Sequence, residues 1–179
     1  MTSNFQLELS NSFRSIPDFP KPGIIFKDIS PILADANLWK ETINDIANAF
    51  RNKNITKIVG IDARGFLVGI SLAMELGIGF VMARKPSKLP GEKLSVSYGL
   101  EYGKDCLEIS KDSIQPDDRV LIVDDLLATG GTAEAAGKLV SLGNGIIVGY
   151  AFIVELKSLK GRERLMKSGK EMVYSCCYF

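Results

Sequence analysis

Four continuous apolar runs constrain the fold of this chain more than any other feature. They span residues 58–61, 79–83, 120–123 and 146–154, and helical stretches lie between several of them. Strands of a parallel sheet show such unbroken runs because helices cover both faces of the sheet. We therefore expect an α/β fold with a central parallel sheet flanked by helices, and the 179 residues suit a single domain.

The segments around these runs predict further elements. Apolar residues at near-helical spacing over residues 5–16 predict a first helix that continues up to Pro17, and a second predicted helix ends near Asn52. The prolines of residues 17–23 predict a turn. Residues 84–103 are rich in Lys, Pro, Gly and Ser, which predicts a long functional loop or hairpin. The last four residues predict a terminal strand.

Charge and composition argue against several kinds of site. The 22 Lys and Arg nearly balance the 21 Asp and Glu, so no global basic field would attract nucleic acid. The sequence contains no histidine, which excludes triads with a histidine base and the usual zinc sites. The three cysteines are too few for a disulfide framework, and we find neither a secretory signal nor a membrane-spanning run. We expect a cytoplasmic protein without a nucleic-acid or membrane partner.

Residues 120–132 carry the most specific functional pattern. An apolar strand is followed by two aspartates, a glycine-containing loop and a helix. In a parallel sheet this order places the loop at the edge where ligands bind, and free N–H groups at a helix start hold anions. The residues expected to bind phosphate and a polyol are Asp124, Asp125, Ala128, Thr129, Gly130, Gly131 and Thr132.

The same segment also shows which anion to expect. It lacks the lysine of a Walker A loop and the glycine spacing of a dinucleotide loop, so a monophosphate beside a polyol fits best. Asp124 and Asp125 suit ribose hydroxyls, which donate hydrogen bonds, or a magnesium ion. The alternative is an ordinary strand-to-helix turn in which the aspartates only cap the helix.

Two other segments are candidates for anion binding. Residues 62–65 lie between a predicted strand and a helix, where Arg64 offers a fork of donors and Gly65 permits close backbone approach. The basic part of residues 84–103 could close over a charged ligand and exclude water. Taken alone, each has an ordinary alternative, a surface arginine in the first and a solvated hairpin in the second.

Together these segments resemble the type I phosphoribosyltransferases. The loop at Asp124 resembles their signature for 5-phosphoribosyl 1-pyrophosphate. Four further blocks, residues 22–31, 60–66, 84–90 and 100–103, resemble the adenine phosphoribosyltransferases in particular. The resemblance implies a type I phosphoribosyltransferase fold over residues 1–179. It also implies a small hood subdomain for base recognition, formed near residues 17–34 and by the C-terminal part, and a flexible lid loop over residues 84–103.

The resemblance assigns roles to the candidate residues. The leaving pyrophosphate would be bound by Asp62, Ala63, Arg64, Gly65, Arg84, Lys85 and Lys88. Asp124 and Asp125 would hold the ribose hydroxyls and assist catalysis, because carboxylates stabilise the positive charge that develops on the ribose. Glu101 would manage a proton at the base or close the lid.

Residues 24–28 would read the base. The Ile25 carbonyl would accept a hydrogen bond from adenine N6, the Lys27 amide would donate to N1, and Phe26 would stack on the ring. Family members often carry arginine at position 27, but a main-chain contact does not depend on that side chain. Ser87 stands where the family usually has glycine, so the flexibility of the lid is expected to differ.

The implied activity is transfer of the 5-phosphoribosyl group from 5-phosphoribosyl 1-pyrophosphate to adenine, giving AMP and pyrophosphate in purine salvage. The implied cofactor is Mg²⁺, held mainly by substrate oxygens, so no direct metal ligand is predicted. A homodimer is implied as well. Two alternatives stay open: a phosphoribosyltransferase for another base, such as hypoxanthine, guanine or a pyrimidine, and a non-catalytic regulator that senses a phosphoribosyl ligand.

Overall fold

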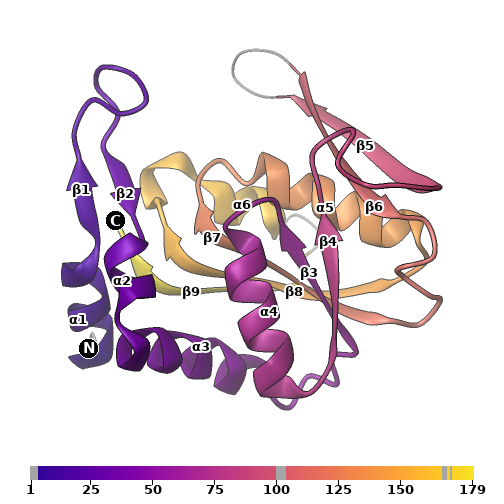
Figure 1. The fold of residues 1–179 in the computed structure, drawn as a ribbon, viewed down its shortest axis with the longest axis horizontal. Helices are drawn as coiled ribbons and strands as arrows, with labels where there is room; N and C mark the ends of the chain where they lie inside the picture. The colour runs from indigo at the N-terminus through magenta and orange to yellow at the C-terminus, as the bar shows by residue number, and fades with distance from the viewer. Residues whose placement is uncertain (1–3, 100–103, 167–168, 170) are drawn as a thin grey trace.

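The computed structural model describes residues 4–99, 104–166, 169 and 171–179, and within them a five-stranded parallel sheet forms the centre (Figure 1). Its strand order is β4-β3-β7-β8-β9. The strands are β3 (Lys57–Ile61), β4 (Gly79–Ala83), β7 (Arg119–Leu127), β8 (Ile146–Glu155) and β9 (Met172–Tyr178). The four apolar runs correspond to β3, β4, β7 and β8, and the predicted terminal strand is β9, so both predictions are confirmed.

Helices and a hairpin bury the two faces of this sheet. On one face lie α1 (Asn4–Ser12), α2 (Ser30–Ala34), α3 (Ala36–Phe50) and α4 (Gly65–Leu76). The other face is covered by α5 (Gly131–Leu142) and the antiparallel pair β5 (Lys93–Gly99) and β6 (Lys104–Ser110). In β7, Leu121 and Val123 pack into the first core and Val120 and Ile122 into the second. The apolar run of this strand is continuous because both of its faces are buried.

The predicted second helix is α3, and it ends at Phe50, close to the expected position. Asp35 caps its start, because the carboxylate accepts hydrogen bonds from the amides of Asn37 and Leu38. The buried face includes Ile46 and Phe50, which contact the sheet core.

The prediction of a first helix up to Pro17 is wrong. Helix α1 ends at Ser12, and β1 (Arg14–Ile16) then pairs antiparallel with β2 (Phe26–Asp28). Arg14 holds this pairing, since its Nη2 lies 2.5 Å from the Asp28 carboxylate of the partner strand. A contact between segments this far apart in sequence overrides the local helical spacing.

The topology creates a crevice between β3 and β7, which are neighbours in the sheet. From β3 the chain passes through α4 to β4 on one side, and from β7 it passes through α5 to β8 on the other. Loops that leave neighbouring strands in opposite directions open a ligand-binding crevice at their carboxyl ends. In the described ranges, no helix has the length and hydrophobicity needed to cross a membrane.

Candidate active site

Two loops form the walls of this crevice, and Gly65 sets the distance between them. A Cβ atom on Gly65 would lie 2.8 Å from the Val123 carbonyl oxygen and 3.0 Å from Asp124 Oδ1. Glycine therefore lets α4 begin directly against β7. The peptide bond between Asp62 and Ala63 in the same loop is cis.

The loop after β7 forms a small pocket at the start of α5. Gly130 has φ +77°, and α5 begins at the next residue. The pocket has a volume of about 70 Å³ and is lined by Asp124, Leu126, Leu127, Ala128, Thr129, Gly130, Gly131, Thr132, Ala133 and Phe152. Amides at a helix start beside threonine hydroxyls form a cradle for one small anion.

The two aspartates lie earlier along the strand than expected. β7 continues to Leu127, so Asp124 and Asp125 are inside the strand rather than after it. Asp124 lines the pocket, whereas Asp125 is not among the described residues that do so. Burial, and after it the negative charge of Asp125, raises the pKa of the Asp124 carboxyl well above its ordinary range.

Arg64 connects three of the predicted groups of residues. Its Nε lies 2.6 Å from Asp125 Oδ2, and its guanidinium lies 5.3 Å from the centre of the Phe26 ring. Asp125 was predicted to contact ribose, Arg64 pyrophosphate and Phe26 the base. These residues come from β7, the β3–α4 loop and β2, and the fold brings them together at one edge of the sheet.

The basic residues of the long segment are placed less uniformly. Arg84 lies at the crevice, with its Nε 3.1 Å from Asp62 Oδ2 in the β3–α4 loop. Lys85 instead pairs with Asp105 of β6 at 3.1 Å. Lys88 is exposed, and its carbonyl oxygen lies 3.4 Å from Arg84 Nη1. Glu101 lies outside the described residues.

Residues 25–27, which were predicted to recognise the base, have side chains that point in different directions. The Phe26 ring packs edge-on against Phe19, with ring centres 5.2 Å apart. Lys27 Nζ donates to Ser15 Oγ at 3.0 Å and lies 3.6 Å from the centre of the Phe179 ring. The Lys27 side chain is therefore held against β1 and the C-terminus. Ile25 is exposed.

Two residues at the site were not predicted from the sequence. Tyr98 of β5 is buried and donates from its hydroxyl to Asp105 Oδ2 at 3.1 Å, and it lies close to Thr132 of the pocket. Phe152 lines the pocket because β8 pairs it with Asp124. Their roles depend on strand register and packing, for which single-sequence patterns carry no direct signal.

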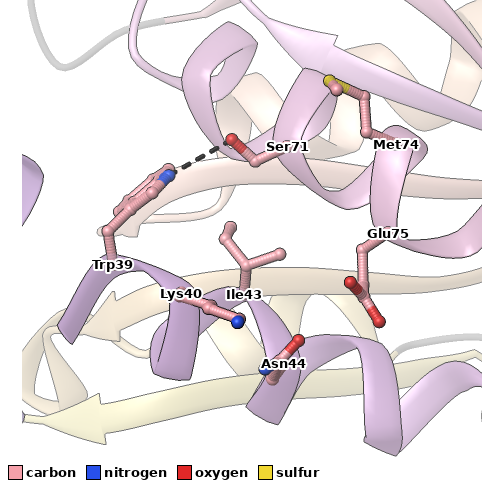
Figure 2. A pocket seen from close by; sticks show the side chains of 7 residues that line it. All are labelled: Trp39, Lys40, Ile43, Asn44, Ser71, Met74 and Glu75. Atoms are coloured by element: carbon pink, nitrogen blue, oxygen red, sulfur yellow. Dashed lines mark hydrogen bonds between the residues drawn. The ribbon is translucent and has the colours of Figure 1, made fainter. Parts of the chain in front are cut away.

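A larger cavity of about 420 Å³ lies between α3 and α4 (Figure 2). Its lining residues are Trp39, Lys40, Ile43, Asn44, Ser71, Met74 and Glu75. Trp39 Nε1 donates to Ser71 Oγ at 3.2 Å across it. The lining shares no residue with the predicted site, so this cavity does not change the location of the candidate active site.

Comparisons with known proteins agree with this geometry. A family model described as phosphoribosyl transferase domain matches residues 28–177. The chain is 50% identical to an adenine phosphoribosyltransferase of Clostridium beijerinckii, over 89% of this chain and 92% of that protein. It is 48% identical to one of Vibrio vulnificus, over 100% of this chain and 98% of that protein.

A solved structure shares the fold as well. The crystal structure of adenine phosphoribosyltransferase from Thermoanaerobacter pseudethanolicus superimposes with a TM-score of 0.93 at 48% sequence identity, covering 97% of this chain and 99% of that chain. The predicted type I phosphoribosyltransferase fold is confirmed. This chain belongs to the phosphoribosyltransferase family and, within it, to the adenine phosphoribosyltransferases.

Proposed function

We propose that this chain transfers the 5-phosphoribosyl group from 5-phosphoribosyl 1-pyrophosphate to adenine in the crevice between β3 and β7, giving AMP and pyrophosphate. The observation that carries the proposal is the position of Arg64 between Asp125 and the Phe26 ring. Three residues assigned to different parts of the substrates meet there, although they come from three separate segments of the chain.

The pocket at the start of α5 is the proposed site of the 5-phosphate. The amides of residues 128–132, with the hydroxyls of Thr129 and Thr132, would donate to the phosphate oxygens. Asp124 also lines this pocket, and the ribose would follow the phosphate on its side. The Asp124 carboxyl oxygens would accept hydrogen bonds from a ribose hydroxyl.

Asp125 and Arg64 are proposed to act on the other side of the sugar. The Asp125 carboxylate would accept from a ribose hydroxyl and stabilise positive charge on the ribose as the bond to pyrophosphate breaks. Arg64 and Arg84 would hold the pyrophosphate oxygens, with Asp62 orienting Arg84 through their ion pair. Lys85 and Lys88 would reach the leaving group from the proposed lid, and Glu101 retains its proposed role in proton management or closure.

Magnesium is the proposed cofactor. Asp124 and Asp125 present carboxylate oxygens, which are the ligands that magnesium prefers. The described residues contain no group of three or more acidic, cysteine or histidine side chains that could hold a metal, so the substrate oxygens would supply most of the ligands. When bound, the ion would neutralise charge on the pyrophosphate.

Adenine is proposed to lie against Phe26, with the Ile25 carbonyl and the Lys27 amide reading its edge. Hypoxanthine would place an oxygen opposite the Ile25 carbonyl, a mismatch that costs about 1–3 kcal/mol. We also propose that the region near residues 17–34, which includes β2, forms the hood together with the C-terminal part, and that residues 84–103 form the lid. A homodimer in the cytoplasm is proposed too, and three free cysteines suit that reducing compartment.

The test of this function is turnover of each candidate base with 5-phosphoribosyl 1-pyrophosphate. We expect AMP formation with adenine, and a kcat/KM for hypoxanthine lower by about 5- to 150-fold. Faster use of hypoxanthine, guanine or a pyrimidine would place the chain with the alternative base specificities. No turnover of any base, together with tight binding of a phosphoribosyl ligand, would support a non-catalytic regulator.

A further inference from the structure

The short helix α6 (Gly161–Leu165) lies directly against the pocket loop. A Cβ atom on Gly161 would lie 2.2 Å from the Ala128 carbonyl oxygen and 3.1 Å from the Gly130 amide nitrogen. From the opposite side, a Cβ atom on Gly130 would lie 2.9 Å from the Gly161 carbonyl oxygen. The two segments therefore lie against each other through backbone atoms, so a shift of α6 toward the loop would displace the main chain of the loop.

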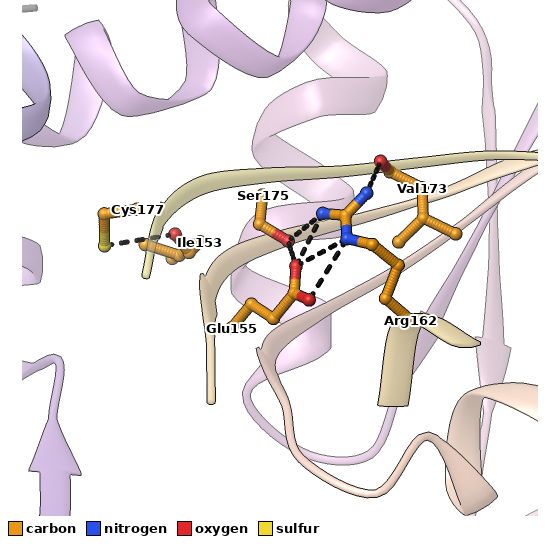
Figure 3. A network of polar contacts seen from close by, with 6 residues as sticks. All are labelled: Ile153, Glu155, Arg162, Val173, Ser175 and Cys177. Atoms are coloured by element: carbon orange, nitrogen blue, oxygen red, sulfur yellow. Dashed lines mark hydrogen bonds and ion pairs between the residues drawn. The ribbon is translucent and has the colours of Figure 1, made fainter. Parts of the chain in front are cut away.

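Arg162 fixes α6 to the sheet through a polar network (Figure 3). Its Nη2 lies 2.5 Å from Glu155 Oε2, its Nε lies 3.1 Å from both carboxylate oxygens, and its Nη1 donates to the Val173 carbonyl at 2.6 Å. Ser175 completes the network, since its hydroxyl donates to Glu155 Oε2 at 2.9 Å. The carboxyl end of β8 and the first half of β9 are thus joined to α6.

The network is buried, and its charged members depend on one another. Glu155 is 4% exposed and Ser175 is 1% exposed, and a buried carboxylate is tolerated only when it is paired and hydrogen-bonded. The planar guanidinium of Arg162 satisfies Glu155 with two nitrogens and the Val173 carbonyl with the third. A lysine cannot reproduce this planar fork.

Arg164 forms a second tie, from α6 to α5. Its Nε and Nη2 lie 3.0 and 2.7 Å from Glu134 Oε2, and Glu134 belongs to the first turn of α5. A Cβ atom on Gly131 would lie 3.3 Å from Arg164 Nη1. Helix α6 therefore contacts the pocket loop, the sheet and the first turn of α5.

We propose that Arg162 is a positioning residue for phosphate binding: by fixing α6 to Glu155 and Ser175, it holds Gly161 against the loop and sets the spacing of the phosphate-binding amides. The inference rests on the proposed function, because it assigns the 5-phosphate to this loop. Arg162 is not among the residues that line the pocket in the described structure, so it acts through Gly161 rather than on the substrate. Misplacing a binding group by about 1 Å can cost about 100-fold in rate.

The experiment separates phosphate binding from base binding. Arg162→Lys and Gly161→Ala are compared with two controls, Arg51→Lys and Gly79→Ala. Arg51 belongs to an exposed ion pair, and a Cβ atom on Gly79 would meet only Lys57 Cγ, at 3.8 Å. Calorimetry measures the affinity for AMP and for adenosine, and steady-state assays measure the KM for 5-phosphoribosyl 1-pyrophosphate and for adenine.

Both test variants are expected to lose about tenfold or more in the ratio of AMP to adenosine affinity, and to raise the KM for 5-phosphoribosyl 1-pyrophosphate correspondingly. The KM for adenine and both controls should stay within about twofold of wild type. Folded variants that keep the wild-type ratio, or that lose AMP and adenosine affinity equally, would overturn the inference.

Two further outcomes distinguish failure of the inference from failure of the proposed function. If a variant fails to fold, Ser175→Ala replaces it, since it removes one hydroxyl from the network and leaves the charged pair in place. An unchanged ratio of AMP to adenosine affinity in Ser175→Ala would then overturn the inference, and a lowered ratio would support it. A wild-type protein that binds AMP no better than adenosine would instead contradict the proposed function itself.

Discussion

The Arg64 side chain is partly exposed, although the aspartate with which it pairs is buried. Its side chain is 42% exposed, whereas that of Asp125 is 5% exposed. A substrate phosphate can therefore reach the guanidinium while the aspartate holds it from the protein side. Bidentate donors of this kind suit pyrophosphate oxygens. At this scale the site is a set of pre-oriented charges, and two single substitutions test it.

Asp125→Asn is expected to lower kcat by about 100-fold or more, because it removes a pre-placed negative charge from the proposed ribose side of the site. The protein should stay folded, since Arg64 is exposed enough to be hydrated without its partner. Steady-state kinetics and thermal unfolding measure the two effects. Glu75→Gln, in the exposed pair with Arg51, is the matched control. A normal kcat in Asp125→Asn would refute the assignment.

Gly65→Ala is expected to lower both stability and activity. The added methyl group would lie 2.8 Å from the Val123 carbonyl oxygen and 3.0 Å from Asp124 Oδ1, and both belong to the central strand. Overpacking of this kind costs about 1–3 kcal/mol of unfolding free energy. Urea denaturation should show this loss for Gly65→Ala and not for Gly79→Ala; equal stability of the two variants would show that α4 can move away from β7.

At the scale of elements, the β5–β6 hairpin is tied to the crevice by side-chain contacts. Tyr98 donates a hydrogen bond to Asp105 and lies close to Thr132, and Lys85 pairs with the same Asp105 carboxylate. The hairpin and the pocket loop are thus linked through one buried tyrosine. The proposed lid begins next to this link, at Arg84, so its motion and the state of the pocket are expected to be coupled.

Lys88→Ala is expected to raise the KM for 5-phosphoribosyl 1-pyrophosphate by about tenfold, the effect of losing one hydrogen bond to a charged group, while the KM for adenine changes little. Initial-rate measurements with each substrate varied in turn test this. Lys111→Ala removes an exposed lysine that pairs with Glu92 on the same hairpin and should change neither constant. Equal changes in both KM values for Lys88→Ala would contradict the lid assignment.

The β1–β2 pair is expected to lose stability in acid. Hydrogen bonds from Ser30, and next from Arg14, lower the pKa of Asp28 from its ordinary value of 3.8 to about 2. A carboxyl with a lowered folded-state pKa stabilises the protein above its unfolded pKa, and this contribution disappears as the pH falls towards 2. Asp28→Asn should therefore differ most from wild type above about pH 4, a value close to the pKa of an unfolded aspartate.

Urea unfolding of wild type and Asp28→Asn at a series of pH values measures this effect. The difference in unfolding free energy should shrink between about pH 4 and pH 2, the interval between the unfolded and folded pKa values. A difference that stays constant across this interval would show that Asp28 titrates normally in the folded protein.

On the scale of the whole molecule, the outer face of α4 remains apolar. Leu67, Ile70 and Met74 lie on one side of the helix at helical spacing, and all three are exposed, Met74 by 79%. A contiguous exposed apolar surface often marks a protein–protein interface. Since α4 begins at Gly65, directly after Arg64, contact between two copies on this face would also brace the pyrophosphate side of the crevice.

Sedimentation velocity is expected to show a species of twice the chain mass of 19.5 kDa. Ile70→Glu should shift the protein towards the monomer, because it places a charge in the proposed apolar contact. Glu41→Gln on the exposed side of α3 serves as a control that should not change the mass. A wild-type monomer, or an Ile70→Glu variant of unchanged mass, would place the proposed interface elsewhere.

The sequence was sufficient to predict the sheet and the position of both crevice loops. Buried strands such as 120–123 carry an unbroken apolar pattern, and the loop that follows has glycines and threonines where an anion cradle needs them. Strand β1 could not be predicted, because its three residues are specified by pairing with Asp28 and its neighbours rather than by their own pattern. The placement of Asp124 inside β7 likewise depends on pairing with Phe152 in β8.

The contacts between α6 and the pocket loop could not be predicted from the sequence either. Gly161 contacts Ala128 and Gly130 from a segment about thirty positions later in the chain, and no local periodicity encodes such a contact. In the sequence, Arg162 has no feature that distinguishes it from an ordinary surface residue of a short helix. Its proposed positioning role is inferred from the structure, in which it pairs with the buried Glu155 carboxylate.

The backbone contact between Gly161 and the pocket loop also limits how this enzyme can be redesigned. The loop that lines the pocket cannot yield on that side by side-chain exchange alone, because the main chain at Gly161 lies directly behind the main chain of Ala128 and Gly130. To admit a bulkier phosphonate or a second phosphate, the segment of residues 156–160 would have to be lengthened. Helix α6 could then move away from the pocket loop.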